Sequence, residues 1–264
     1  MEIAGYIASL IIGLSLGLIG GGGSILTVPV LVYLFGVNPV AATAYSLFIV
    51  GTTSLVGAWP KYRQQEVNLK TAIIFGIPSI AAVYATRAFI IPVIPDTIFT
   101  AGSFVLTKPL MLMLIFAVLM VAASISMIRS PRKKNEGAPV KQSFNYPVIL
   151  LEGTLVGLLT GLVGAGGGFL IIPALVILSK LPMKQAVGTS LLIIAAKSLI
   201  GFTGDLGKID MDWTLLLSVT ALAIVGIFVG NRLSTRIAAN ALKKGFGWFV
   251  LVMGIYIIAK ELFF

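Results

Sequence analysis

Long apolar runs, separated by short polar or glycine-rich stretches, make up most of the chain. Read with a window of about 19 residues, this pattern predicts ten apolar segments. The segments lie at 3–19, 24–36, 40–59, 69–94, 107–128, 146–163, 168–179, 183–204, 213–235 and 245–264. An α-helix needs about 20 residues to cross a hydrocarbon core of about 30 Å, and most of the segments come close to that length. The pattern therefore predicts an all-α polytopic membrane protein.

Two of the segments, 24–36 and 168–179, are too short to cross a bilayer as ordinary helices. At about 1.5 Å per residue they reach only about 18 to 20 Å, and each follows a run of glycines. Non-helical backbone at membrane depth is tolerated only where it is buried in protein or faces a polar cavity. We therefore expect these two segments to be short, re-entrant helices broken by glycine near the midplane.

The two halves of the chain repeat each other. A polar, basic linker at 129–145 separates a first transmembrane repeat, 1–128, from a second, 146–264. A shift of 144 residues aligns 17–57 with 161–201 without a gap, and 17 of these 41 positions are identical. The matches include glycines, a proline and serines at fixed spacing, so we interpret the pattern as an internal duplication of about five segments per repeat.

Loop charges predict that the two repeats are inverted. The loop 61–70 has a net charge of +2, and the equivalent loop 205–212 has a net charge of −2. Lys and Arg favour short cytoplasmic loops, so equivalent loops are expected on opposite faces of the inner membrane. The linker 129–145 is then cytoplasmic, and both termini lie on the outer face. If each glycine break were a kink within one long helix, the copies would be parallel and both loops would share a face.

Composition narrows the classes of function. The chain is 58% apolar and 11% charged, and it contains neither His nor Cys. This excludes thiolate or imidazole metal sites and Ser-His-Asp catalysis. The net charge of +10 comes from residues in short loops, not from a patch suited to nucleic acid. We expect no enzymatic activity, no cofactor and no metal; the expected partners are the lipid bilayer and a small anionic substrate, and the oligomeric state stays open.

The duplicated glycine runs are the first candidate site. The residues are Gly20, Gly21, Gly22, Gly23 and Ser24 in the first repeat, and Gly164, Gly166, Gly167 and Gly168 in the second. The segment after each run would direct free N–H groups and the positive end of its dipole into a cavity. Two such N-termini would form an anion site near the midplane. The alternative is that the glycines only allow helices to pack closely.

Ionisable residues inside apolar segments are the second signal, because they are costly in a membrane. Lys197 has no acidic residue within one helical turn, so we expect it to supply a cation to the anion site, with snorkelling as the alternative. Glu152 is a candidate for proton coupling, or else an interfacial residue. Arg87 and Arg232 come near the ends of their segments, where snorkelling or a helix C-cap charge is the expected role.

Hydroxyl groups form a third set of candidates. Tyr45 and Ser46 occupy the same places in the first repeat as Thr189 and Ser190 in the second. Their hydroxyls are positioned to bind the oxygens of an anion. The alternative is that each bonds a carbonyl of its own helix, as hydroxyls in membrane helices often do.

Several motifs resemble those of the TauE/SafE sulfite exporter family. They are Gly17-Leu-Ile-Gly-Gly-Gly-Gly-Ser-Ile-Leu-Thr-Val-Pro29, Gly161-Leu-Val-Gly-Ala-Gly-Gly-Gly-Phe-Leu-Ile-Ile-Pro173, Ala186-Val-Gly-Thr-Ser190 and Gly201-Phe-Thr-Gly. The resemblance covers nearly the whole chain and implies an inner-membrane permease for small sulfur-containing anions such as sulfite or organosulfonates. The family pattern commonly has an amide or small polar residue where this chain has Lys197, so no particular substrate is carried over.

These observations favour a secondary transporter for small sulfur-containing oxyanions, exporting by alternating access. A cation or metal transporter is one alternative, but it needs acidic ligands, and the predicted segments contain only Glu152 and, near the end of the last one, Glu261. A non-transporting membrane subunit is the other alternative. A subunit of this kind would have no use for the duplicated glycine runs, which argues against this alternative. A dry, fully packed interior at the runs would argue for it.

Overall fold

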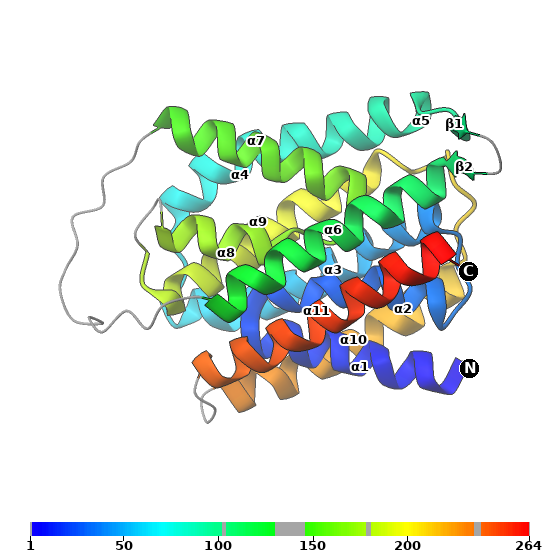
Figure 1. Ribbon diagram of the computed structural model, residues 1–264. Helices are drawn as coiled ribbons and strands as arrows, with labels where there is room; N and C mark the ends of the chain where they lie inside the picture. Colours follow the sequence, from blue (N-terminus) through cyan, green and yellow to red (C-terminus); the bar gives the residue numbers. More distant parts are fainter. Residues whose placement is uncertain (1, 102–103, 130–145, 178–180, 235–238, 264) are drawn as a thin grey trace.

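The computed structural model describes residues 2–101, 104–129, 146–177, 181–234 and 239–263, and nearly all of them are helical (Figure 1). The first half contains α1 (Glu2–Ile19), the 3₁₀ helix η1 (Gly20–Leu26), α2 (Thr27–Tyr33), α3 (Pro39–Arg63), α4 (Leu69–Ala85), the π-helical turn η2 (Thr86–Ile90), α5 (Ile91–Val93) and α6 (Lys108–Arg129). The second half contains α7 (Tyr146–Val163), α8 (Gly168–Ile177), α9 (Met183–Thr203), α10 (Trp213–Ser234) and α11 (Ala239–Phe263).

Five stretches of helix within the described residues are long and apolar enough to cross a membrane. They are Pro39–Arg63, Leu69–Val93, Lys108–Arg129, Met183–Thr203 and Trp213–Ser234. Shorter apolar helices cover Ile3–Ile19, Gly23–Tyr33 and Pro147–Val163. The prediction of a helical, multi-pass membrane protein is therefore confirmed.

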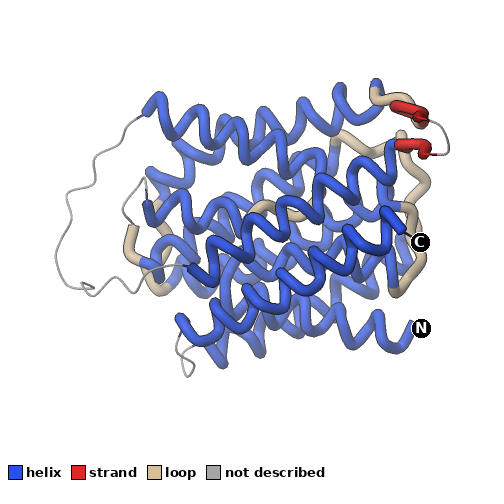
Figure 2. Tube along the Cα trace, viewed as in Figure 1, coloured by secondary structure: helices blue, strands red, loops and turns tan. Residues whose placement is uncertain are grey.

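One small element departs from the all-α expectation. Strands β1 (Thr97–Ala101) and β2 (Phe104–Thr107) pair antiparallel at one end of the bundle (Figure 2). The β1 sequence is rich in β-branched and aromatic residues, which favour strands. The N–H of Lys108 donates to the carbonyl of Asp96 at 2.9 Å and closes the base of this ribbon, where α6 begins.

Several helices begin where a polar side chain caps their first turn. Asn38 accepts from the N–H of Val40 at 2.9 Å, and Pro39 follows at the first helical position of α3. Asn68 caps α4 by accepting from the N–H of Thr71 at 3.0 Å. At the start of α10 the carboxylate of Asp212 accepts from the N–H of Leu215, also at 3.0 Å.

Helix boundaries recur at the interval of 144 residues found in the sequence. Helix α7 begins and ends 144 residues after α1, and α9 and α10 begin 144 residues after α3 and α4. Packing follows the same relation, because α1 packs on α10 while α7 packs on α4. Helix α3 packs on α9, and α6 on α11. In Figure 1, α1 begins at the right-hand side of the bundle and its equivalent α7 begins at the left.

The interfaces of α1 with α10 and of α7 with α4 rely on glycine. A Cβ added to Gly13 would overlap the carbonyl group of Ala223, and one added to the equivalent Gly157 would overlap the carbonyl oxygen of Ser79. Small residues let membrane helices approach this closely. Close packing therefore explains these glycines outside the two runs.

Helices α3 and α9 form the centre of the bundle. In the most apolar 18-residue stretch of each helix, 67% of the residues are buried. The corresponding share is 39% to 44% in Leu69–Val93, α6 and α10. We call the end of the bundle that carries loop 204–212 and the two strands the Asp205 end. The opposite end carries loop 64–68, and we call it the Lys61 end (Figure 1). The linker 129–145 lies outside the described residues except for Arg129, the last residue of α6.

Candidate functional site

The second glycine run is a true interruption between two helices. Gly164, Gly166 and Gly167 have positive φ angles of 72°, 63° and 63°, which a glycine adopts at little cost. Helix α8 begins at Gly168, and the N–H groups of Leu170 and Ile171 both donate to the carbonyl of Gly167 at 3.0 Å. The first N–H groups of a helix have no intrahelical acceptor, so this run presents a helix N-terminus.

The first glycine run differs from the sequence expectation. Gly20 has a φ of 72°, but the run continues directly as the 3₁₀ helix η1 and leads into α2, which has seven residues. Because 3₁₀ bonds satisfy backbone groups within the run itself, no open break forms there. Of the two expected half-helix N-termini, the one at α8 is present.

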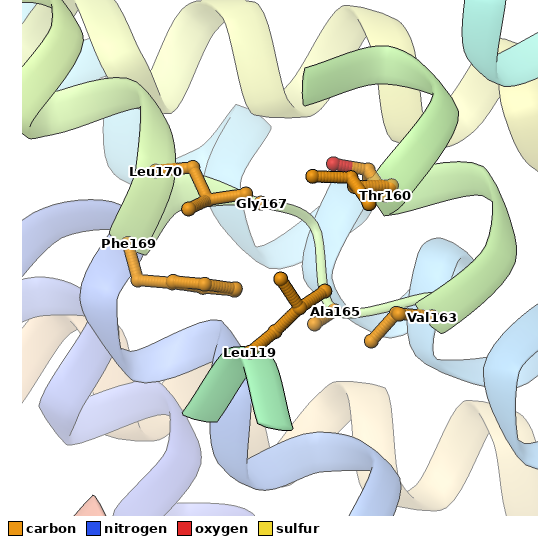
Figure 3. A pocket seen from close by; sticks show the side chains of 8 residues that line it. Leu119, Thr160, Val163, Ala165, Gly167, Phe169 and Leu170 are labelled. Carbon is orange, nitrogen blue, oxygen red and sulfur yellow. The ribbon is translucent and has the colours of Figure 1, made fainter. Parts of the chain in front are cut away.

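The two runs meet backbone to backbone. A Cβ added to Gly21 would overlap the Cα of Gly168, and a Cβ added to Gly168 would overlap the backbone of Gly21. The expected polar cavity is therefore closed in this structure. In its place a crevice too narrow to admit a water molecule lies beside the second run (Figure 3). Its lining is Leu119, Leu159, Thr160, Val163, Ala165, Gly167, Phe169 and Leu170, and Thr160 supplies its polar side chain.

Lys197, which the sequence grouped with the glycine runs, lies against the second run. The side chain is fully buried, and its Nζ donates to the hydroxyl of Thr160 at 2.9 Å. A Cβ built on Gly167 would lie 2.7 Å from the same Nζ. Neither of the two ion pairs between described residues includes Lys197. Snorkelling is therefore wrong for this residue, and the ammonium group lies beside the first turn of α8 with no carboxylate from the described part of the chain paired to it.

Thr160 was missed as a site residue. Its equivalent in the first half is Leu16, so the repeat gave no signal. The available signal was its place one turn before Gly164, where its backbone carbonyl also accepts from the N–H of Gly164 at 2.7 Å.

Some of the predicted hydroxyls bond only their own helices. Ser24 donates to the carbonyl of Gly21 at 2.7 Å, and Ser190 donates to the carbonyl of Val187 at 2.8 Å. Both follow the local alternative. Ser46 is fully buried and has no hydrogen-bond partner among the described residues.

Tyr45 and Thr189 hold loops at opposite ends of the bundle. The hydroxyl of Tyr45 accepts from the N–H of Asp212 in loop 204–212. The hydroxyl of Thr189 accepts from the N–H of Asn68, at 2.9 Å, in loop 64–68. The two bonds are equivalent at the 144-residue shift, and each joins one half of the chain to the other. The structure uses these hydroxyls in the loops and does not gather them around Lys197.

Other buried hydroxyls lie on the central helix pair. Thr53 and Ser54 on α3 and Ser198 on α9 are fully buried, and none has a partner among the described residues. Thr53 is the equivalent of Lys197, and Ser54 that of Ser198. A buried donor without an acceptor costs free energy. A polar ligand that bonded these three hydroxyls would remove that cost.

Glu152 lies on α7, partly exposed, eight residues before Thr160. At 1.5 Å per residue, that separation is about 12 Å along the helix. The carboxylate therefore does not neutralise Lys197, and its predicted part in proton coupling stays a prediction.

Arg87 corrects another expectation. Its side chain is fully buried in η2, where Nε donates to Oδ2 of Asp205 at 2.6 Å. Its Nη1 donates to the hydroxyl of Thr43 at 2.9 Å and to the carbonyl of Gly161 at 3.1 Å. Snorkelling or C-capping is therefore wrong here, because loop 204–212 covers the guanidinium with an acidic partner. Burial raises the pKa of the Asp205 carboxyl, and the nearby Arg87 and Lys208 act against that rise.

The two buried cations share one helix end. Lys197 donates to Thr160 and Arg87 donates to Gly161, which are consecutive residues in the last turn of α7. The C-terminal end of a helix carries a partial negative charge. This turn therefore stabilises both cations without supplying a formal counter-charge.

A family model described as "Sulfite exporter TauE/SafE" matches residues 6–257. The chain belongs to this family. The glycine runs, Lys197 and Arg87 all lie within the matched range, and the resemblance found in the sequence motifs is confirmed.

Curated relatives carry transporter names. A probable membrane transporter protein of Xylella fastidiosa is 31% identical over 95% of this chain and 92% of its own length. The probable membrane transporter protein YunE of Bacillus subtilis is 28% identical over 96% and 94% of the two chains. In Methanocaldococcus jannaschii, the probable membrane transporter protein MJ0441 is 24% identical over 96% and 93%. No solved structure matches the chain. Family and relatives together indicate a membrane transporter.

Proposed function

We propose that the protein is a secondary transporter that exports small sulfur-containing oxyanions, such as sulfite or organosulfonates, by alternating access. The observation that carries the proposal is Lys197, whose ammonium is fully buried and has no carboxylate partner among the described residues. Removing such a charge from water costs several kcal/mol. A bound anion would offset that cost at the point where the two halves meet.

The anion site is assembled from the second half of the chain. The Lys197 ammonium supplies the charge, the Thr160 hydroxyl lies 2.9 Å from it, and the first turn of α8 presents backbone N–H groups beside it. The contact of Gly21 with Gly168 closes the site from the first half. Entry of an anion requires these two backbones to separate.

An inverted repeat supports alternating access. Helix bounds recur at 144 residues, equivalent helices exchange packing partners, and α1 and α7 begin at opposite ends of the bundle (Figure 1). These features favour repeats 1–128 and 146–264 of opposite topology. In this arrangement η1 with α2, and α8, are the re-entrant segments. The Lys61 end is cytoplasmic, and both termini are on the outer face of the inner membrane.

The dry, packed interior beside the glycine runs is the feature expected of a non-transporting subunit. Lys197 argues against that alternative, because a permanently closed core gains nothing from a buried, unpaired charge. An occluded state of a transporter accounts for both features. A cation transporter is disfavoured, since no group of three acidic residues that could hold a metal ion occurs among the described residues.

Thermal stabilisation of the purified protein tests the proposal. Sulfite, sulfoacetate, thiosulfate, sulfate, chloride and divalent cations are compared on wild type, Lys197→Met and Lys184→Met. Lys184 is exposed on the same helix, so it controls for loss of charge alone. A ligand at 100 times its dissociation constant adds about 2.7 kcal/mol to stability. We expect a shift with a sulfur oxyanion that only Lys197→Met loses, and a shift with cations alone would overturn the proposal.

A further inference from the structure

Arg87 is paired but not fully satisfied. Its Nε and Nη1 have acceptors, whereas Nη2 is buried with no hydrogen-bond partner among the described residues. Asp205 contacts the guanidinium through one carboxylate oxygen, although arginine and carboxylate groups usually pair through two parallel bonds. The site therefore holds a buried donor that an oxyanion with several oxygens would satisfy better than Asp205 does.

The backbone around Arg87 is also specialised. Pro92 has no N–H to offer to the carbonyl of Ala88, and that carbonyl instead accepts from Nζ of Lys208 at 2.8 Å. The helix widens here into a π turn, in which the N–H of Ile91 donates to the carbonyl of Thr86. Such turns occur frequently at functional sites. Two cations, Arg87 and Lys208, lie at this turn, and both act on the carboxylate of Asp205.

We propose that Arg87 is a second anion subsite, and that Asp205 occupies it as an internal anion until a transported oxyanion takes its place. The inference rests on the proposed function. A trigonal or tetrahedral sulfur oxyanion would accept from Nε and the unpaired Nη2 together, in the two-pronged geometry that guanidinium favours. Thr43, which already donates to the carbonyl of Val40, stays bound to Nη1.

The position of Arg87 links the subsite to the central site. Arg87 and Lys197 bind adjacent residues of α7, so an anion that moves from Lys197 towards the Asp205 end meets Arg87 next. Displacement of Asp205 would also loosen loop 204–212. That loop is held to the first half by the Arg87–Asp205 ion pair, the Lys208 bond to Ala88 and the Tyr45–Asp212 bond. Anion binding at Arg87 removes the ion pair among these contacts and therefore favours opening of this end.

Binding stoichiometry tests the subsite. Radiolabelled sulfite is titrated in sodium gluconate by equilibrium dialysis against wild type, Asp205→Asn and the matched control Asp210→Asn, which removes an exposed charge from the same loop. We expect wild type and Asp210→Asn to bind one sulfite tightly and a second weakly, because the second must displace Asp205, and we expect Asp205→Asn to bind both tightly. The double variant Asp205→Asn with Arg87→Met should return to one. A single sulfite with unchanged affinity in Asp205→Asn overturns the subsite.

Lys197→Met separates this result from the proposed function. If the central site fails but the subsite is correct, wild type binds one sulfite weakly, and Asp205→Asn binds one tightly with or without Lys197→Met. If the central site is correct and the subsite is not, Lys197→Met alone abolishes binding, and Asp205→Asn matches wild type.

A second measurement does not depend on the folding of Asp205→Asn. The chain has no cysteine, so Leu206→Cys places a single thiol on the exposed loop. Sulfite should raise its rate of maleimide labelling about tenfold, because charge-assisted bonds replace those that hold the loop. The same thiol with Arg87→Met and Asp205→Asn should show no sulfite effect. A labelling rate independent of sulfite in the Arg87-containing protein overturns the proposal.

Discussion

The two ends of the bundle use equivalent loops that are secured differently. At each end a capping residue, Asn68 or Asp212, begins the next helix and donates its N–H to a hydroxyl of the other half. The position of Asp205 corresponds to Lys61 at the opposite end. Lys61 pairs with Glu66 of its own loop at 2.8 Å, whereas Asp205 pairs across the halves with Arg87. Among the described residues, the Asp205 end is thus closed by a hydrogen bond and an ion pair between the two halves, and the Lys61 end by a hydrogen bond between the halves and an ion pair within the first half.

Removal of the charged residue at each end should give the largest difference. Asp205→Ala leaves Arg87 buried and unpaired, which costs about 3 to 5 kcal/mol. Lys61→Ala breaks a partly exposed pair, whose side chains are 15% and 19% exposed, and should cost about 0 to 1 kcal/mol. Thermal unfolding in one detergent compares the two. Equal losses of stability in the two variants would show that the buried Arg87–Asp205 pair contributes no more than the partly exposed Lys61–Glu66 pair.

Removal of the two hydroxyls should affect both ends alike. Tyr45→Phe and Thr189→Val each leave a loop N–H without its acceptor, at a cost of about 1 to 3 kcal/mol. Each variant should favour opening at its own end. Single cysteines placed in loops 64–68 and 204–212 report this as labelling from opposite faces of a vesicle. Increased labelling at the same loop in both variants would contradict the equivalence of the two bonds.

Loss of the helix caps should have a smaller effect. Asn68→Ala and Asp212→Ala each remove a side-chain cap worth about 1 kcal/mol. Asp212 also places a negative charge at the N-terminus of α10, so its loss should cost about 0.3 to 1 kcal/mol more. Added salt should shrink that excess. Asn38→Ala, which removes the cap of α3, is the control. If Asn68→Ala lost more stability than Asp212→Ala, the contribution assigned to the charge of Asp212 would be wrong.

The smallest expected effect is a pH dependence confined to the Asp205 end. Burial raises the pKa of Asp205, and the groups that face it, Arg87 and Lys208, act against that rise. As the pH falls through this raised pKa, the carboxyl becomes neutral and competes less for Arg87. Methanesulfonate, whose own charge is constant, should then bind a few-fold tighter per pH unit, below the limit of about tenfold. Asp205→Asn should bind methanesulfonate with no such dependence.

Periodicity and spacing predicted the helical segments and the 144-residue repeat, and they grouped Lys197 with the glycine runs without saying which run it contacts. These features follow from local rules: apolar length, glycine backbone and the cost of a charge in an apolar segment. Lys197 lacks an acidic neighbour along its helix, and the structure adds no described carboxylate from other helices.

The partners of Arg87 and Thr160 could not be predicted from the sequence, because they depend on which helices pack together. Arg87 comes near the end of an apolar segment, the usual setting for snorkelling. Its burial depends on a loop 118 residues away along the chain. The 3₁₀ course of the first glycine run was not predictable either, because two similar motifs take different shapes in the two halves.

The contact of Gly21 with Gly168 also restricts how the two proposed copies of the ancestral unit diverge. A side chain at either position would enter the backbone of the other copy. The equivalent positions in the opposite copies, Ala165 and Ser24, are not glycine, so the crossing joins unlike positions of the two copies. A mutation at either glycine disturbs both copies. These two positions are therefore constrained by each other and not by the repeat.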